Sequence, residues 1–120
     1  ENETVEHLTR FSDILLLGHD YAEDLDRLQR LLQLAETANV SLDGKAFPRI
    51  GAIGSRSKWK SFTASCIDVG IQSATLDQVR CPIGLNIGAE SPEEIAIAVI
   101  AEILSMHKDA DVHAPNWRDQ

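Results

Sequence analysis

Blocks of apolar residues separated by glycines and polar turns predict a short strand and then a helix near the start of the chain. Four consecutive apolar residues, 14–17, end at Gly18, and such a run is typical of a strand covered on both faces. From residue 21 to about residue 36, apolar residues recur every three or four positions, which indicates an amphipathic helix. Asp20 directly precedes this helix and is predicted to cap its N-terminus.

The same order of elements then repeats. Residues 37–47 carry the Asp-Gly and Asn signals of a loop, and residues 48–53 predict a second short strand. A helix with a basic start follows from residue 56 to about residue 69, and Gly70 is predicted to close it. The polar stretch 72–78 is compatible with one further helical turn.

The last third of the chain contains the clearest helix start. Ser91, Pro92 and Glu94 form a capping box, with an N-cap serine, a proline at the first helical position and a glutamate three residues after the serine. The helix from residue 92 to about residue 107 is apolar around most of its circumference, so we expect it to be buried on more than one side. Before it, residues 83–88 predict either a third strand or an extended loop.

The alternation of strands and helices predicts the α/β class with a three-layer parallel sheet. The first strand is too apolar for an exposed sheet edge, where it would promote aggregation. Its outer edge should therefore be covered by a missing N-terminal half, a second copy or, less favourably, residues 1–12. We expect one domain over residues 1–120, the C-terminal half of a doubly wound domain, with an N-terminal segment and a tail over residues 108–120 that is extended or frayed. A first residue other than Met agrees with a segment of a longer protein.

Length, composition and charge narrow the function classes. A chain of 120 residues with 43% hydrophobic and 25% charged residues is a folded, water-soluble chain with room for a single domain. Its net charge of −8 would repel a phosphate backbone, which disfavours nucleic-acid binding. Two cysteines, Cys66 and Cys81, predict free thiols in a reducing cytosol. Because no run approaches the length of a membrane span and no signal peptide is visible, we expect a cytoplasmic protein without membrane contact.

The turn after the second predicted strand makes the strongest case for a binding site, because ligands of open parallel sheets bind at the carboxyl ends of the strands. Gly54 and Ser55 lead into a helix whose first N–H groups and dipole favour an anion. Ser55 can donate a hydroxyl, and Arg56 a bidentate guanidinium, to a phosphate or carboxylate. Arg56 and Lys58 oppose the helix dipole unless an anion lies between them. The turn therefore predicts an anion site, with solvated surface bases as the alternative.

Two further clusters follow predicted strand ends. His19 could hydrogen-bond a ligand or act as a general acid or base, and the alternative is that Asp20 caps the helix while His19 packs against its next turn. Gly84, Asn86 and Gly88 offer no reactive groups, and their expected role is close approach of the backbone to a ligand. The chain shows neither a nucleophile–base–orienter set nor metal-ligand spacing. This argues against hydrolase chemistry and a metal site.

Three segments carry motifs of a known family. They are GHDYAEDLD at 18–26, IGAIGSRSK at 50–58 and CPIGLNIGAESPEEIA at 81–96, and the last match continues to about residue 104. Together they resemble the C-terminal part of the XdhC family of xanthine dehydrogenase accessory proteins. That family has "THD" after one strand, "GSR" with a following base after the next, and "PIGLDIGA-TPEEIA" near its end. The matches span roughly residues 13–107.

The resemblance implies a Rossmann-like fold and an accessory protein, more a cofactor carrier than an enzyme. It would bind the molybdenum cofactor (molybdopterin), assist its sulfuration and hand it to a xanthine dehydrogenase-type molybdenum hydroxylase, with a cysteine desulfurase as a further partner. By this analogy Ser55 and Arg56 hold the cofactor's phosphate or pterin, and His19 borders the same pocket. The other residues of the expected cofactor-binding set are Asp20, Gly54, Lys58, Gly84, Asn86 and Gly88.

The chain departs from the family in three places. Gly18 replaces the usual Thr, and Asn86 replaces the usual Asp, which removes a charge and speaks against a metal or general-base role there. The family's opening motif "GAGHVG" is missing, so a dinucleotide site of the usual kind is unsupported. We therefore expect a homo-oligomer or pairing with a missing N-terminal half. The alternatives are a nucleotide-dependent oxidoreductase or transferase domain that grips phosphate with residues 54–58, and a purely structural half-domain.

Overall fold

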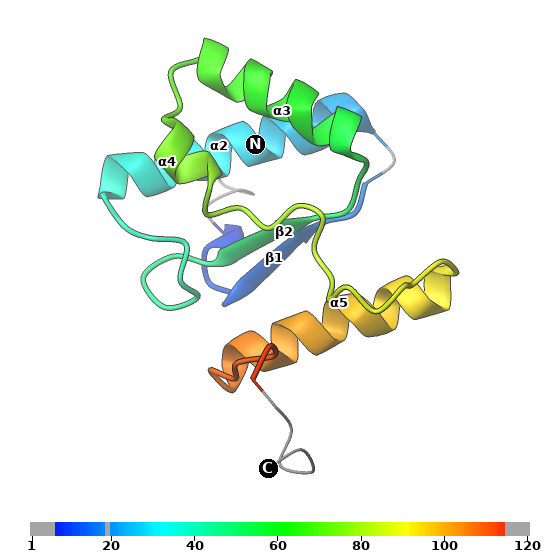
Figure 1. Ribbon diagram of the computed structural model, residues 1–120. Coiled ribbons are helices and arrows are strands. Elements are labelled where there is room, and N and C mark those ends of the chain that lie inside the picture. The colour runs from blue at the N-terminus through cyan, green and yellow to red at the C-terminus, as the bar shows by residue number, and fades with distance from the viewer. Residues whose placement is uncertain (1–6, 19, 115–120) are drawn as a thin grey trace. The chain divides into compact units, whose positions relative to one another are not determined.

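The structure is a computed structural model that describes residues 7–18 and 20–114 (Figure 1). It divides the chain into two compact units, Glu1–Pro82 and Ile83–Gln120. The predicted alternation of strands and helices is confirmed in the first unit. Its elements are β1 (Asp13–Leu16), α2 (Tyr21–Ala38), β2 (Arg49–Ala52), α3 (Arg56–Asp68) and the short α4 (Ser73–Leu76), and the second unit contains α5 (Pro92–His107).

Strands β1 and β2 form a parallel pair, as predicted. Asp13 lies opposite Arg49 in this pair, and the Arg49 guanidinium donates to both carboxylate oxygens of Asp13, from Nε at 2.8 Å and from Nη2 at 3.1 Å. This bidentate contact raises the pKa of Arg49 above its ordinary value. Within residues 7–18 and 20–114, no strand pairs with the outer edge of β1.

Among the described residues, only a single one, Arg80, pairs with β2 at the position of a third strand. The backbone N–H of Arg80 donates to the Ile50 carbonyl at 3.0 Å, and the Ala52 N–H donates to the Arg80 carbonyl at 2.9 Å. The ladder stops there because Pro82, two residues on, has no N–H to continue it. Residues 83–88 contain no strand, so of the two predicted alternatives the extended loop is the one that forms.

Local capping signals set the helix ends. Asp20 caps α2 through its side chain, which accepts from the Glu23 N–H at 3.1 Å, so the predicted N-cap is confirmed. The helix runs two residues beyond the predicted end and stops at Asn39, which adopts a left-handed conformation with φ 56°. Ser55 caps α3, and Gly70 follows its end with φ 93°.

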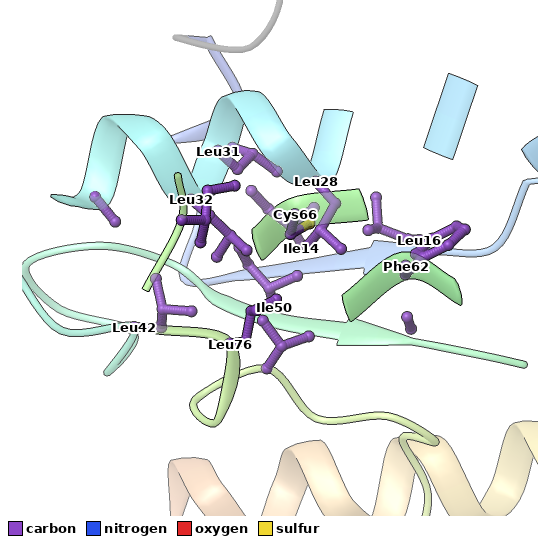
Figure 2. Close-up of a cluster of buried hydrophobic side chains, with 14 of the residues drawn as sticks. Ile14, Leu16, Leu28, Leu31, Leu32, Leu42, Ile50, Phe62, Cys66 and Leu76 are labelled. Carbon is purple, nitrogen blue, oxygen red and sulfur yellow. The ribbon is translucent and has the colours of Figure 1, made fainter. Parts of the chain in front are cut away.

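The core of the first unit lies between the sheet and the helices that cover one of its faces (Figures 1 and 2). Leucines from the inner face of α2 meet Phe62 and Cys66 of α3 above the apolar side chains of both strands (Figure 2). Close packing of this kind removes apolar surface from water at about 25 cal/mol per Å². Within this hydrophobic core, the residues with at most 1% exposure are Leu28, Leu31, Leu32, Ala35, Ile50, Phe62 and Cys66.

The second unit is built on α5. The capping box is confirmed, since the Ser91 hydroxyl accepts from the Glu94 N–H at 3.2 Å and the Glu94 carboxylate accepts from the Ser91 N–H at 3.1 Å. Ala98, Val99 and Glu102 are buried on one face of the helix. The opposite face stays exposed at Ile97, Ile100 and Leu104. The expectation that this helix is buried on more than one side is therefore wrong.

The two end segments are only partly described. Residues 1–6 of the N-terminal segment and residues 115–120 of the tail lie outside the described residues. Of the tail, residues 108–109 and 112–113 form turns after the end of α5. No helix in the described ranges has the length and apolar character needed to span a membrane.

Candidate functional site

The loops that follow β1 and β2 lie at one edge of the sheet, because the two strands are parallel. The loop after β1 contains Gly18 and Asp20, and the turn after β2 contains Gly54 and Ser55. His19, predicted to border a ligand pocket, lies outside the described residues. Asp20 is exposed, and one of its carboxylate oxygens is used in capping α2.

The start of α3 has the properties of an anion site. The Ser55 hydroxyl oxygen accepts from the Lys58 N–H at 3.1 Å, while its own hydrogen stays available for donation. The backbone N–H groups of Arg56 and Ser57 have no acceptor in the part of the chain that the structure describes. No acidic residue lies in the first turn of α3, whereas α2 and α5 both begin with acids. The dipole at this end is therefore open to an external anion.

The side chains of Arg56 and Lys58 differ in exposure: Arg56 is exposed to solvent and Lys58 is half-buried. Arg56 is exposed, and its guanidinium makes no hydrogen bond or ion pair within residues 7–18 and 20–114. Lys58 turns inward, where its ammonium donates to the Ile53 carbonyl at 3.2 Å and lies 5.3 Å from the centre of the Phe62 ring. Of the two bases, Arg56 alone faces solvent with its charge free for a ligand.

Asp24 was not among the predicted site residues, yet it contacts both the loop after β1 and the first turn of α3. Its side chain is 3% exposed, accepts from the Gly18 N–H at 3.1 Å and lies 3.9 Å from the Lys58 ammonium. A sequence signal for it exists, because Asp24 stands on the same helical face as Leu28 and Leu32, where apolar residues are expected. An acid at such a position requires partners in the fold.

Gly18 lies directly against the Asp24 carboxylate. A Cβ at this position would meet Asp24 Oδ1 at 2.5 Å, which is closer than real contacts allow. The threonine expected at this position from the family motif therefore does not fit beside Asp24 as it is placed here. At Gly54 a Cβ would meet Cδ of Lys58 at 2.8 Å, so this glycine makes room for the lysine stem.

Both cysteines are free thiols, as predicted. Burial raises the pKa of the Cys66 thiol to about 11. Burial also raises the pKa of Cys81, which is half-buried, and the positive charge of Lys58 opposes this rise. Both environments favour the thiol over the reactive thiolate.

The third predicted cluster belongs to the second unit. Gly84 has φ 129° and donates its N–H to the buried Glu102 carboxylate at 2.8 Å. Asn86 and Gly88 are exposed, and Gly88 has φ 76° with open space around it. Gly84 therefore serves the packing of the loop against α5.

A pocket of about 270 Å³ lies elsewhere in the first unit, at the carboxyl end of α2. Glu36 lines it and accepts from the Gln72 N–H at 2.8 Å and the Thr75 hydroxyl at 2.7 Å. The remaining lining residues include Asn39, Ser41 and Gln78. Within the described ranges, no group of three or more His, Cys, Asp or Glu side chains is placed to hold a metal ion.

A parallel strand pair with covering helices and an anion-favouring turn at the carboxyl edge defines one part of a Rossmann-like α/β domain. Residues 1–103 match the family described as the XdhC Rossmann domain. The chain belongs to this family, which confirms the resemblance seen in its motifs.

Individual relatives match over shorter segments. The chain is 39% identical over 61 residues to the uncharacterized protein YqeB of Escherichia coli (strain K12), a match covering 51% of this chain and 11% of that protein. It is 63% identical over 27 residues to a probable subunit of xanthine dehydrogenase from Bacillus subtilis (strain 168), a match that covers 22% of this chain and 8% of that protein. A crystal structure of a xanthine dehydrogenase from Bacillus halodurans matches with a TM-score of 0.57 and 25% identity over 79% of this chain and 24% of that one. The chain thus spans a quarter or less of each of these proteins.

Proposed function

We propose that this chain is the cofactor-handling part of an accessory protein for a xanthine dehydrogenase-type molybdenum hydroxylase. In this role it binds the molybdenum cofactor, assists its sulfuration together with a cysteine desulfurase, and passes it to the enzyme in the cytoplasm. Membership in the XdhC Rossmann family and the similarity to a probable subunit of xanthine dehydrogenase support the link to that enzyme. A second copy or an N-terminal half-domain would complete the assembly.

The start of α3 is the observation that carries the binding proposal. Two N–H groups and the Arg56 guanidinium have no partner among the described residues, and together with the Ser55 hydroxyl they favour one anionic group at the helix N-terminus. The molybdenum cofactor ends in a phosphate, so these residues fit that end of the cofactor. When bound, the cofactor supplies the molybdenum and its sulfur ligands. The chain's own contribution is to hold and orient the phosphate.

The experiment is a retention assay under anaerobic conditions. The purified chain is incubated with the molybdenum cofactor and separated by gel filtration, and the protein peak is assayed for pterin fluorescence and molybdenum. We expect co-elution. Arg56→Ala should weaken retention by about 1–3 kcal/mol, roughly five- to 150-fold, because a charge-assisted bond to phosphate is lost.

Lys60→Ala is the matched control, because Lys60 is an exposed base of the same helix beyond its first turn. It changes the net charge by the same amount and should leave retention within about twofold of the wild-type value, as expected for a screened surface charge. Equal losses in both variants, or no co-elution at all, would contradict the proposal. Saturable binding of NAD or another nucleotide without pterin would instead favour a nucleotide-dependent enzyme domain.

A further inference from the structure

An acid–base pair lies beside the loops that follow β1 and β2, with a buried acid on α2 and a half-buried base in the first turn of α3. Asp24 of α2 and Lys58 of α3 lie 3.9 Å apart, with side chains 3% and 26% exposed. Asp24 also accepts from the Gly18 N–H, and Lys58 donates to the Ile53 carbonyl. The pair therefore joins the loop after β1 to the turn after β2 through charged groups of the chain itself.

The glycines of both loops are matched to this pair. The space that a Cβ of Gly18 would need is filled by the Asp24 carboxylate, and the space at Gly54 is filled by the Lys58 stem. Glycines at such turns often allow a ligand phosphate to approach the backbone. Here the internal carboxylate, and not a ligand, is the anion that takes the Gly18 N–H.

The Lys58 ammonium thus has two partners within the chain, the Ile53 carbonyl and the Asp24 carboxylate. A lysine binds phosphate as a mobile point charge, and phosphate sites that grip two linked phosphates use a lysine of this kind to reach the second one. Lys58 is in the right turn for that task, but its ammonium donates to the Ile53 carbonyl at 3.2 Å and lies within ion-pair distance of the Asp24 carboxylate, at 3.9 Å. Arg56 remains as the one basic side chain of the turn whose charge is free within the described residues.

We propose that Asp24 is a specificity-determining residue that sequesters Lys58 and so makes the site selective for a single phosphate group over a diphosphate. This inference rests on the proposed anion site at the start of α3. It assigns the ligand to the phosphomonoesters, and it disfavours dinucleotides and nucleoside diphosphates, whose second phosphate finds no cation.

The test measures the affinities of the chain for inorganic phosphate and for pyrophosphate by titration calorimetry at fixed ionic strength. The variants are Asp24→Asn, Lys58→Gln and the double variant, which keep side-chain shape and hydrogen-bonding groups while removing charge. Asp24→Asn should raise pyrophosphate affinity about tenfold and phosphate affinity at most about threefold, because it frees one charge-assisted contact. The double variant should lose that gain.

Lys58→Gln in the wild-type background is an independent measurement, and it should change neither affinity by more than about twofold, because a withheld lysine contributes no direct contact. If it weakens pyrophosphate binding as strongly as Arg56→Ala does, Lys58 already reaches the ligand and the inference is overturned. Unchanged pyrophosphate affinity in a folded Asp24→Asn variant overturns it as well. A different set of results is expected if there is no anion site at the start of α3. The wild type and Asp24→Asn would then bind neither phosphate nor pyrophosphate, and Arg56→Ala would have no effect. That outcome overturns both proposals.

Discussion

Replacing Gly18 by alanine tests whether the buried carboxylate of Asp24 organises the carboxyl edge of the sheet. The added methyl would lie 2.5 Å from Asp24 Oδ1 and 3.0 Å from Asp24 Cγ. Asp24 sits on the buried face of α2 with its side chain 3% exposed, so it has little room to move aside. The carboxylate must therefore turn away from the Gly18 N–H and from Lys58.

Three contributions set the magnitude. Losing a buried hydrogen bond to a charged group costs about 1.5–3 kcal/mol. Overpacking beside a rigid neighbour costs about 1–3 kcal/mol. Alanine offsets part of this, because it reduces the entropy of the unfolded chain by about 0.4–1 kcal/mol relative to glycine. The free energy of unfolding should fall by about 2–5 kcal/mol in total.

The assay is urea unfolding followed by far-UV circular dichroism, in the wild-type and Asp24→Ala backgrounds. In Asp24→Ala the clash is absent, so Gly18→Ala should be neutral or stabilise by up to about 1 kcal/mol. Gly54→Ala is the control at the neighbouring turn, where the flexible stem of Lys58 can shift and the cost should stay below about 1 kcal/mol. The reasoning is refuted if Gly18→Ala costs the same with and without the Asp24 carboxylate.

The Cys66 thiol should resist a thiol-modifying reagent at neutral pH until the chain unfolds, because burial raises its pKa to about 11 from an ordinary value of 9.0. The free energy of unfolding should fall as the pH rises from about 9 to 11, because only the unfolded thiol loses its proton in this range. Cys66→Ala should lack this fall. Leu32→Ala should lower the free energy of unfolding in urea by about 2–5 kcal/mol, because this side chain is fully buried. Ile100→Ala, at a side chain that is 65% exposed, should change it by no more than about 0.5 kcal/mol. Equal losses in the two variants would contradict the burial pattern. Ser91→Ala should lower stability of α5 by about 1 kcal/mol in thermal unfolding, and no change would mean that the capping box contributes nothing.

Most of the fold was predictable from local patterns. The strand after Ser12, the helix after Asp20 and the capping box at Ser91 depend on residues within a few positions of one another, so they are visible in sequence. The secondary structure of residues 83–88 was not predictable, because an apolar run bounded by glycines fits a strand and a loop equally well. Whether such a run pairs depends on hydrogen-bond partners contributed from elsewhere in the chain.

In the candidate site too, local sequence patterns predicted some features and missed others. Ser55 and Arg56 were identified from a glycine turn leading into a basic helix, and the structure leaves their anion-binding groups available. Lys58 carries the same formal charge as Arg56 and lies two residues away, yet its ammonium turns inward to Asp24. Nothing in the spacing of the three residues indicates this difference.

By itself, the sequence determined the class of the chain, the order of its main elements and its family, and it predicted the turn at which we propose that an anion binds. These features follow from periodicity, capping and motif residues, which act over short stretches of chain. Only the tertiary structure decided that Asp24 fills the space beside Gly18 and lies within ion-pair distance of Lys58. The reason is that this contact joins helices α2 and α3 across 34 residues of sequence, and its existence depends on how both pack on the same face of the sheet.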